Sequence, residues 1–176
     1  MTLTTHSLVT ETFVPMLESL AGIIEKGEAH AATTGQDLIN ARLAPDMFHF
    51  AKQIDAVSFF ARNTASRLSG GPALAPGGEP KTSWAELKAQ VTDALAAVRA
   101  APVAGFEGAD ERDCAMELPG GMQLPLNGEQ FLVRFALPNF YFHLACAYAI
   151  LRNHGVELGK RDYLAGIASL MQPKPD

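Results

Sequence analysis

The chain has 176 residues, 48% of them hydrophobic, and a formal net charge of −5 at pH 7. A chain of this length fits one domain, 1–176, and buries roughly 70% of the surface of its unfolded form, so no disulfide or structural metal is needed to hold a core together. The negative charge and the lack of any run of Lys or Arg exclude a nucleic-acid partner.

Three features bear on the cellular compartment. No stretch approaches the roughly 18 consecutive apolar residues of a membrane span, so no membrane association is predicted. The start of the chain, from Met1 to His6, has neither the basic start nor the apolar core of a signal peptide. Two lone cysteines, Cys114 and Cys146, are typical of small core residues in a reducing compartment. We therefore expect a cytoplasmic protein.

The first predicted element is an amphipathic helix from about Ser7 to Ala32. Its apolar residues recur at spacings of three and four, which is the period of one helical face. Thr33, Thr34 and Gly35 then end the helix.

A second helix is predicted from Pro45 to about Leu68. Pro45 suits the first turn of a helix, and Asp46 beside it favours the positive end of the helix dipole. If the helix begins there, Asp46, His49 and Gln53 share one polar face, at positions i, i+3 and i+7.

Residues 69–80 are rich in glycine and proline and predict a surface loop within one domain. Ser83 followed by Glu86 is a capping-box pattern, and apolar residues then follow at helical spacing. These signals predict a third helix from Ser83 to Ala100, which Pro102 ends.

A small β-hairpin is predicted between the third and fourth helices. Two short runs, 111–118 and 122–125, flank a Pro119-Gly120-Gly121 turn. Because an isolated hairpin is marginally stable in water, we expect it to pack on the helices.

The last long segment, from Asn127 to Asn153, completes an all-α four-helix bundle. Pro138 interrupts this segment, so we expect either a kink or two consecutive helices with Pro138 in the first turn of the second. A short helical turn at 160–164 and a frayed end at 172–176 follow.

The part of this segment from Leu137 to Arg152 is apolar almost all the way round and is therefore expected at the centre of the bundle. Polar side chains on it need partners. One interpretation is structural: His143 bonds to Gln53 of the second helix, and Asn139 closes a buried polar network with them.

The alternative interpretation is a small-molecule pocket between helices, apolar apart from a few convergent polar groups. Its candidate residues are His143, Gln53, Asn139, Tyr148 and Tyr141.

Several segments together carry a resemblance to a known family. They are Ala41–Met47, Phe106–Gly108, Leu137–His143, Tyr148–Arg152 and Gly155–Leu164. In this order, over nearly the whole chain, they resemble the bacterial family catalogued as domain of unknown function 1993, and the Pro-Asn-Phe-Tyr-Phe-His block is the specific part. The resemblance implies a fold similar to the DinB and YfiT superfamily of proposed metalloenzymes, whose members are four-helix bundles and are often dimeric. It implies no particular reaction, because one fold carries many activities.

The superfamily's metal site uses one His from the second helix and two His, four residues apart, from the last long helix. Here His49 and His143 match, but Ala147 and Asn139 stand at the positions four residues after and before His143. Asp46 could supply an oxygen instead, and two imidazoles with a carboxylate would suit Zn, Ni or Mn.

Two hypotheses about function follow, and neither assigns a catalytic residue. In the first, the chain is a DinB-like homodimer that binds a small molecule or is structural, with a degenerate metal site around His143. In the alternative, it is a divalent-metal-dependent enzyme of the thiol transferase or hydrolase type, in which His49, His143 and Asp46 hold the metal that activates water or a thiol.

Overall fold

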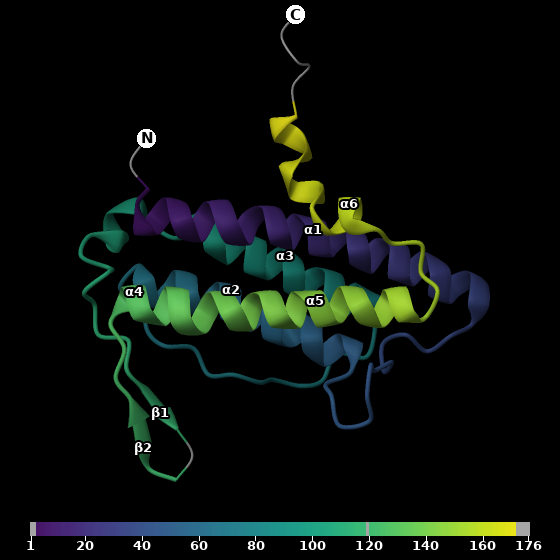
Figure 1. The fold of residues 1–176 in the computed structure, drawn as a ribbon, viewed down its shortest axis with the longest axis horizontal. Coiled ribbons are helices and arrows are strands. Elements are labelled where there is room, and N and C mark those ends of the chain that lie inside the picture. Colours follow the sequence, from purple (N-terminus) through teal and green to yellow (C-terminus); the bar gives the residue numbers. More distant parts are fainter. Residues whose placement is uncertain (1–2, 119, 172–176) are drawn as a thin grey trace, which may run out of the picture.

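The amphipathic repeats of the sequence form four helical segments that lie side by side (Figure 1). The computed structural model describes residues 3–118 and 120–171. The first three segments are α1 (Thr5–Thr34), α2 (Phe50–Leu68) and α3 (Trp84–Ala100). The fourth consists of α4 (Gly128–Gln130), the π-helical segment η2 (Phe131–Ala136) and α5 (Leu137–Asn153). The predicted all-α bundle is confirmed.

The core lies where these segments meet. The helix α2 packs against both α3 and α5, and α1 packs against α3. Phe13 of α1 and Phe140 of α5 are fully buried and meet edge to face, with 4.7 Å between their ring centroids. Burial of each such ring contributes about 1.5–3 kcal/mol, so this contact helps to fix α1 against α5.

The helix α1 is long and apolar enough to cross a membrane, with a mean hydropathy of 1.3 over 18 residues. Its apolar side chains, among them Leu17, Leu20 and Ile24, are however buried inside the bundle. This composition is that of a core helix, and it is weak evidence for a membrane span.

The predicted start of the second helix at Pro45 is wrong. The helix α2 begins at Phe50, and His49 is its N-cap, with Nδ1 accepting a hydrogen bond from the backbone N–H of Lys52 at 3.3 Å. The connector between α1 and α2 folds back on the start of α2, since the N–H of Phe50 donates a hydrogen bond to the carbonyl of Ala41 at 2.9 Å. Asp46 therefore lies in a loop, and the polar helical face predicted for Asp46, His49 and Gln53 does not form.

The loop after α2 and the start of α3 follow the prediction. Residues 69–82 contain no helix or strand, and Ser83 caps α3. Glu86 and Ser83 form the reciprocal bonds of a capping box, which satisfies backbone N–H groups in the first turn. A 3-10 segment, η1 (Val103–Phe106), follows α3.

The predicted hairpin consists of β1 (Met116–Leu118) and β2 (Met122–Leu124), which pair antiparallel with Met116 opposite Leu124. Its base is attached to the bundle, because Cys114 is buried and Arg67 of α2 donates to the carbonyl of Ala115 at 3.0 Å. Its far end projects from the bundle (Figure 1), so the expected packing on the helices holds at the base alone. Pro119 of the predicted turn lies outside the described residues.

The fourth segment accommodates Pro138 in the first turn of α5, directly after the π-helical segment. This confirms the prediction of consecutive helices. The Nδ2 of Asn139 donates to the carbonyl of Phe135 at 2.7 Å, so this side chain bonds within its own helical segment.

The chain ends with α6 (Lys160–Tyr163) and the 3-10 segment η3 (Ala165–Leu170). Lys26 of α1 forms an ion pair with Asp162 at 2.6 Å, and the N–H of Gly166 donates to Ser19 of α1 at 2.9 Å. Beyond these anchors the chain rises away from the bundle (Figure 1). The predicted frayed end, 172–176, lies outside the described residues.

Candidate functional site

The side chain of His143 lies between α5 and α2 and bonds to Gln53. The distance from Nδ1 of His143 to Oε1 of Gln53 is 2.7 Å. Gln53 is 1% exposed, whereas His143 is half-buried. The bond predicted between these two residues is confirmed.

The bonding of Gln53 determines which nitrogen of His143 carries the hydrogen. Nε2 of Gln53 donates to the carbonyl of Phe48 at 3.1 Å, so the atom that faces His143 is the carbonyl oxygen. An amide oxygen accepts and never donates, so the network assigns the hydrogen to Nδ1 of the imidazole. The lone pair of the neutral ring is then on Nε2.

Nε2 of His143 is open to solvent. No residue in the described part of the chain bonds to it, and it is not one of the buried polar atoms without a partner. Burial of the rest of the ring lowers the pKa of His143 below its usual value, because the surroundings disfavour the charged form. His143 thus presents a neutral hydrogen-bond acceptor at neutral pH.

Three phenylalanine rings surround the imidazole, and we call Phe48, Phe60 and Phe142 the aromatic cage. Phe48 and Phe60 both stack nearly parallel to His143, at 5.9 Å and with interplanar angles of 14° and 15°. Phe142 meets the imidazole edge to face at 5.2 Å. Phe60 is buried, but Phe48 is 48% exposed and Phe142 is 56% exposed, so the cage presents apolar surface to water beside Nε2.

The other residues predicted for the pocket are not brought to this place. Asn139 bonds to its own helix and takes no part in the network of His143 and Gln53. Tyr148 packs edge to face on Tyr163 at 5.7 Å, and Tyr141 is close enough to Tyr163 to raise its pKa, which burial chiefly raises. Tyr141 is about 200° around α5 from His143, so the tyrosines face α6 while His143 faces α2.

The three predicted metal ligands do not come together either. Asp46 is exposed in the connector, and Nδ1 of His49 caps α2. Within residues 3–118 and 120–171, no three His, Cys, Asp or Glu side chains lie close enough to hold a metal ion. The position that matches the superfamily's second His of the last long helix holds Ala147, which is a buried core residue.

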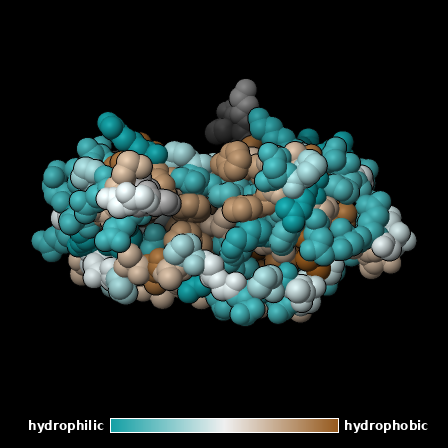
Figure 2. Space-filling model, turned by 90° about the horizontal axis from the view of Figure 1, so that it is seen from below, coloured by the Kyte–Doolittle hydropathy of each residue, from teal (hydrophilic) through white to brown (hydrophobic). Residues whose placement is uncertain are grey.

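Phe48 and Phe142 are the site residues that sequence reasoning missed. Phe142 lies inside the Pro-Asn-Phe-Tyr-Phe-His block, and Phe48 directly follows the segment Ala41–Met47. An exposed phenylalanine, however, cannot be told from a buried one by residue type alone. Figure 2 shows the face seen from below, where small apolar areas interrupt a mainly hydrophilic surface.

Comparisons with known proteins place this geometry in context. The model of a family described as "Domain of unknown function (DUF1993)" matches residues 5–164. A solved structure from Shewanella denitrificans, described as a DinB family member protein, is 31% identical with a TM-score of 0.79, and the match covers 97% of this chain and 94% of that one. No curated protein matches the chain. The DinB-like fold expected from the sequence is thus confirmed over nearly the whole chain.

Proposed function

The chain belongs to the DUF1993 family, and we propose that it is a small-molecule-binding protein whose ligand occupies the aromatic cage at His143. The observation that carries this proposal is the hydrogen bond from His143 to Gln53, which leaves Nε2 as an acceptor beside two exposed aromatic rings. Small-molecule sites combine apolar and aromatic surface with a few fixed polar groups, and the cage has this composition.

The cage selects for a particular ligand chemistry. A flat, apolar ring would cover Phe48 and Phe142, which removes apolar surface from water. A single donor on that ring, a hydroxyl or an N–H, would bond to Nε2 of His143.

The alternative of a divalent-metal enzyme has no matching set of donor atoms. Asp46, His49 and His143 do not form a group of three, and no other such group occurs in the described part of the chain. Zinc in catalytic sites takes three protein ligands. The proposed role of His143 is therefore ligand binding.

Phenol and toluene test the proposal, because they share a ring and differ by one hydroxyl donor. Titration followed by amide chemical shifts should show that phenol binds more tightly, and that His143→Phe abolishes the difference. Phe142→Ala should weaken phenol binding by about fivefold or more, since it removes apolar contact area. Val103→Ala is the matched control, because Val103 is an exposed apolar residue of η1 outside the cage.

Two results would count against the site. If phenol and toluene bind equally to the wild-type protein, Nε2 is not the acceptor. If neither binds, or if Val103→Ala weakens binding as much as Phe142→Ala, the cage is not a ligand site and His143 has a structural role.

We also propose that the chain is a homodimer and that it works in the cytoplasm. Leu170 and Met171 at the end of η3 are 76% and 80% exposed, and apolar groups of this kind are often covered by a partner. The free thiols of Cys114 and Cys146 are both buried, which suits a reducing compartment. Light scattering should give the mass of two chains for the wild type and of one for Leu170→Glu, and a wild-type monomer would contradict the dimer.

A further inference from the structure

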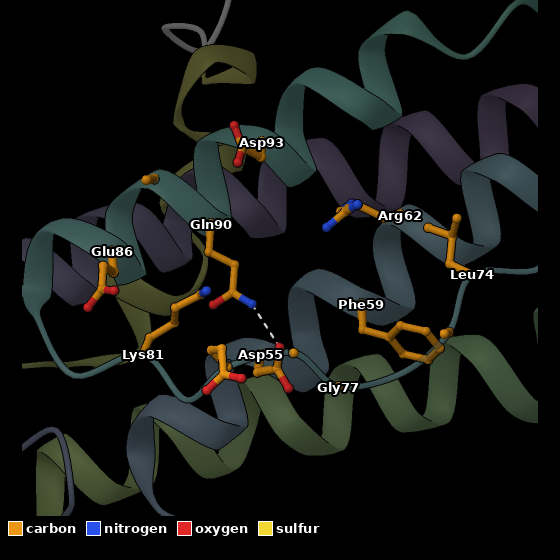
Figure 3. A pocket seen from close by; sticks show the side chains of 13 residues that line it. Asp55, Phe59, Arg62, Leu74, Gly77, Lys81, Glu86, Gln90 and Asp93 are labelled. Carbon is orange, nitrogen blue, oxygen red and sulfur yellow. Dashed lines mark hydrogen bonds between the residues drawn. The ribbon is translucent and has the colours of Figure 1, made fainter.

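A second candidate site lies on the opposite side of α2 from the aromatic cage. A cleft of about 300 Å³ opens between α2 and α3, beneath the loop of residues 70–82, which we call the strap (Figure 3). Gln53 and Phe60 of α2 face α5, whereas Asp55, Phe59 and Arg62 line this cleft. The cleft is therefore independent of His143.

The lining carries four carboxylates and two cations. They are Asp55, Glu79, Glu86, Asp93, Arg62 and Lys81. Two of the carboxylates already have internal partners. Asp55 accepts from Lys52 at 2.5 Å and from Gln90 at 2.8 Å, and Glu86 accepts from backbone N–H groups at the start of α3.

The four groups that remain are of both signs: Glu79 and Lys81 on the strap, Arg62 on α2 and Asp93 on α3. Arg62 reaches from α2 toward α3 (Figure 3) and forms no hydrogen bond or ion pair within the described residues. Its guanidinium fork matches the geometry of a carboxylate. Asp93 of α3 likewise has no ion pair in the described part of the chain, and it lies one turn after Gln90. Oε1 of Gln90 is buried and accepts no hydrogen bond from the described residues.

A buried acceptor without a donor is uncommon in folded proteins. Gln90 cannot relieve it by turning its amide over, because Nε2 would then leave the carboxylate of Asp55. This oxygen is enclosed by protein, so a ligand in the cleft reaches it only if the side chains around it shift. Asp93 is exposed to solvent one turn further along α3, and its carboxylate favours a positive charge at this end of the cleft.

The apolar part of the lining comes from Phe59 and Leu74. The strap above them is held at its ends: the N–H of Leu74 donates to Asn63 at 2.9 Å, and that of Thr82 donates to Glu86 at 3.1 Å. Between these anchors, residues 75–81 form no hydrogen bond with other described residues. The middle of the strap can therefore shift to admit a ligand without breaking backbone bonds.

From these contacts we infer that the cleft binds a zwitterion of the amino-acid class with an apolar side chain. Its carboxylate pairs with Arg62, its ammonium pairs with Asp93, and its side chain packs on Phe59 and Leu74 beneath the strap. A simple anion would meet an excess of carboxylates in the lining, and a simple cation would leave Arg62 unpaired. The volume of the cleft lies at the small end of ligand sites, as expected for a ligand of this size.

The test uses L-phenylalanine and two analogues that each lack one charge, 3-phenylpropionate and 2-phenylethylamine. Amide chemical shifts of the intact protein should move at Gln90, Asp93 and Leu74 on addition of L-phenylalanine. Each analogue should bind at least about tenfold more weakly, because it loses a charge-assisted hydrogen bond. Arg62→Gln should weaken the binding of L-phenylalanine by a similar factor.

Arg134→Gln is the matched control, because Arg134 is an exposed arginine on η2 outside the cleft. It should leave binding unchanged. The inference is overturned if L-phenylalanine causes no shifts at the cleft, if either analogue binds as tightly as L-phenylalanine, or if Arg62→Gln has no more effect than Arg134→Gln. The response of His143 to phenol is unaffected by any of these results, so the two sites are tested separately.

Discussion

The chemistry of the site is set by two hydrogen bonds of Gln53, one to Phe48 and one to His143. The amide of Gln53 is held by the carbonyl of Phe48, and it in turn holds Nδ1 of the imidazole. Contrary to the prediction, Asp46 and His49 do not share a helical face with Gln53, because α2 begins only at Phe50. The bond between Gln53 and His143 was nevertheless predicted correctly. The bond could be predicted because a buried amide needs a partner, and an imidazole on the apolar helix that packs against it can supply one.

Replacing Gln53 should destabilise the protein strongly for a single polar side chain. Gln53→Leu leaves Nδ1 of His143 and the carbonyl of Phe48 without partners, and each unsatisfied group costs about 1–3 kcal/mol. Urea unfolding should show that the free energy of unfolding of Gln53→Leu is lower than that of the wild type by about 2 kcal/mol or more. Gln36→Leu, at an exposed position in the connector, is the control and should stay within about 0.5 kcal/mol of wild type.

The pKa of His143 gives a pH-dependent term in stability. Burial lowers this pKa in the folded state, so the unfolded chain takes up a proton at a higher pH than the folded one. Stability is therefore retained above the usual His pKa of about 6.5 and is lost as the pH falls from there through the folded pKa. In urea unfolding, the free energy of unfolding of His143→Phe should fall less over this pH range than that of the wild type. An NMR titration that gives a pKa of about 6.5 or above for His143 in the folded protein would contradict this expectation.

Helix boundaries show where sequence patterns stop being informative. Bounds set by a local cap, such as Ser83 with Glu86 at the start of α3, were predicted well because the signal lies within four residues. Pro45 gave an equally good local signal for the start of α2 and was wrong. The reason is tertiary: the N–H of Phe50 bonds back to Ala41, so the connector stays irregular as far as His49.

The two interior glycines of α1 should respond oppositely to alanine. Gly22 faces open space, so Gly22→Ala should stabilise the protein by about 0.5–1 kcal/mol through the lower entropy of the unfolded chain. A Cβ at Gly27 would lie 2.8 Å from Leu151 and 3.1 Å from Trp84, where α1 meets α5 and α3. Gly27→Ala should therefore be destabilising by thermal unfolding, and equal effects of the two substitutions would show that α1 does not approach its neighbours this closely.

The bundle as a whole followed from the sequence, but its surface did not. Helical periodicity is a one-dimensional signal, and it identified the four segments that form the core. The aromatic cage and the cleft under the strap depend on which side chains remain uncovered after packing, such as Phe48, Phe142 and Arg62. Tyr141 and Tyr148 were assigned to the wrong face for the same reason, because α5 is apolar on nearly all sides and its rotation is set by its neighbours.

The tautomer of His143 is the most direct test of the proposed site. A long-range ¹H–¹⁵N correlation spectrum of the labelled protein, recorded well above the usual His pKa, distinguishes a protonated ring nitrogen from one with a lone pair. We expect that Nδ1 carries the hydrogen, that Nε2 has the lone pair, and that phenol shifts the Nε2 resonance. A hydrogen on Nε2 would contradict the proposed site, because Nε2 would then be a donor and could not accept a hydrogen bond from phenol.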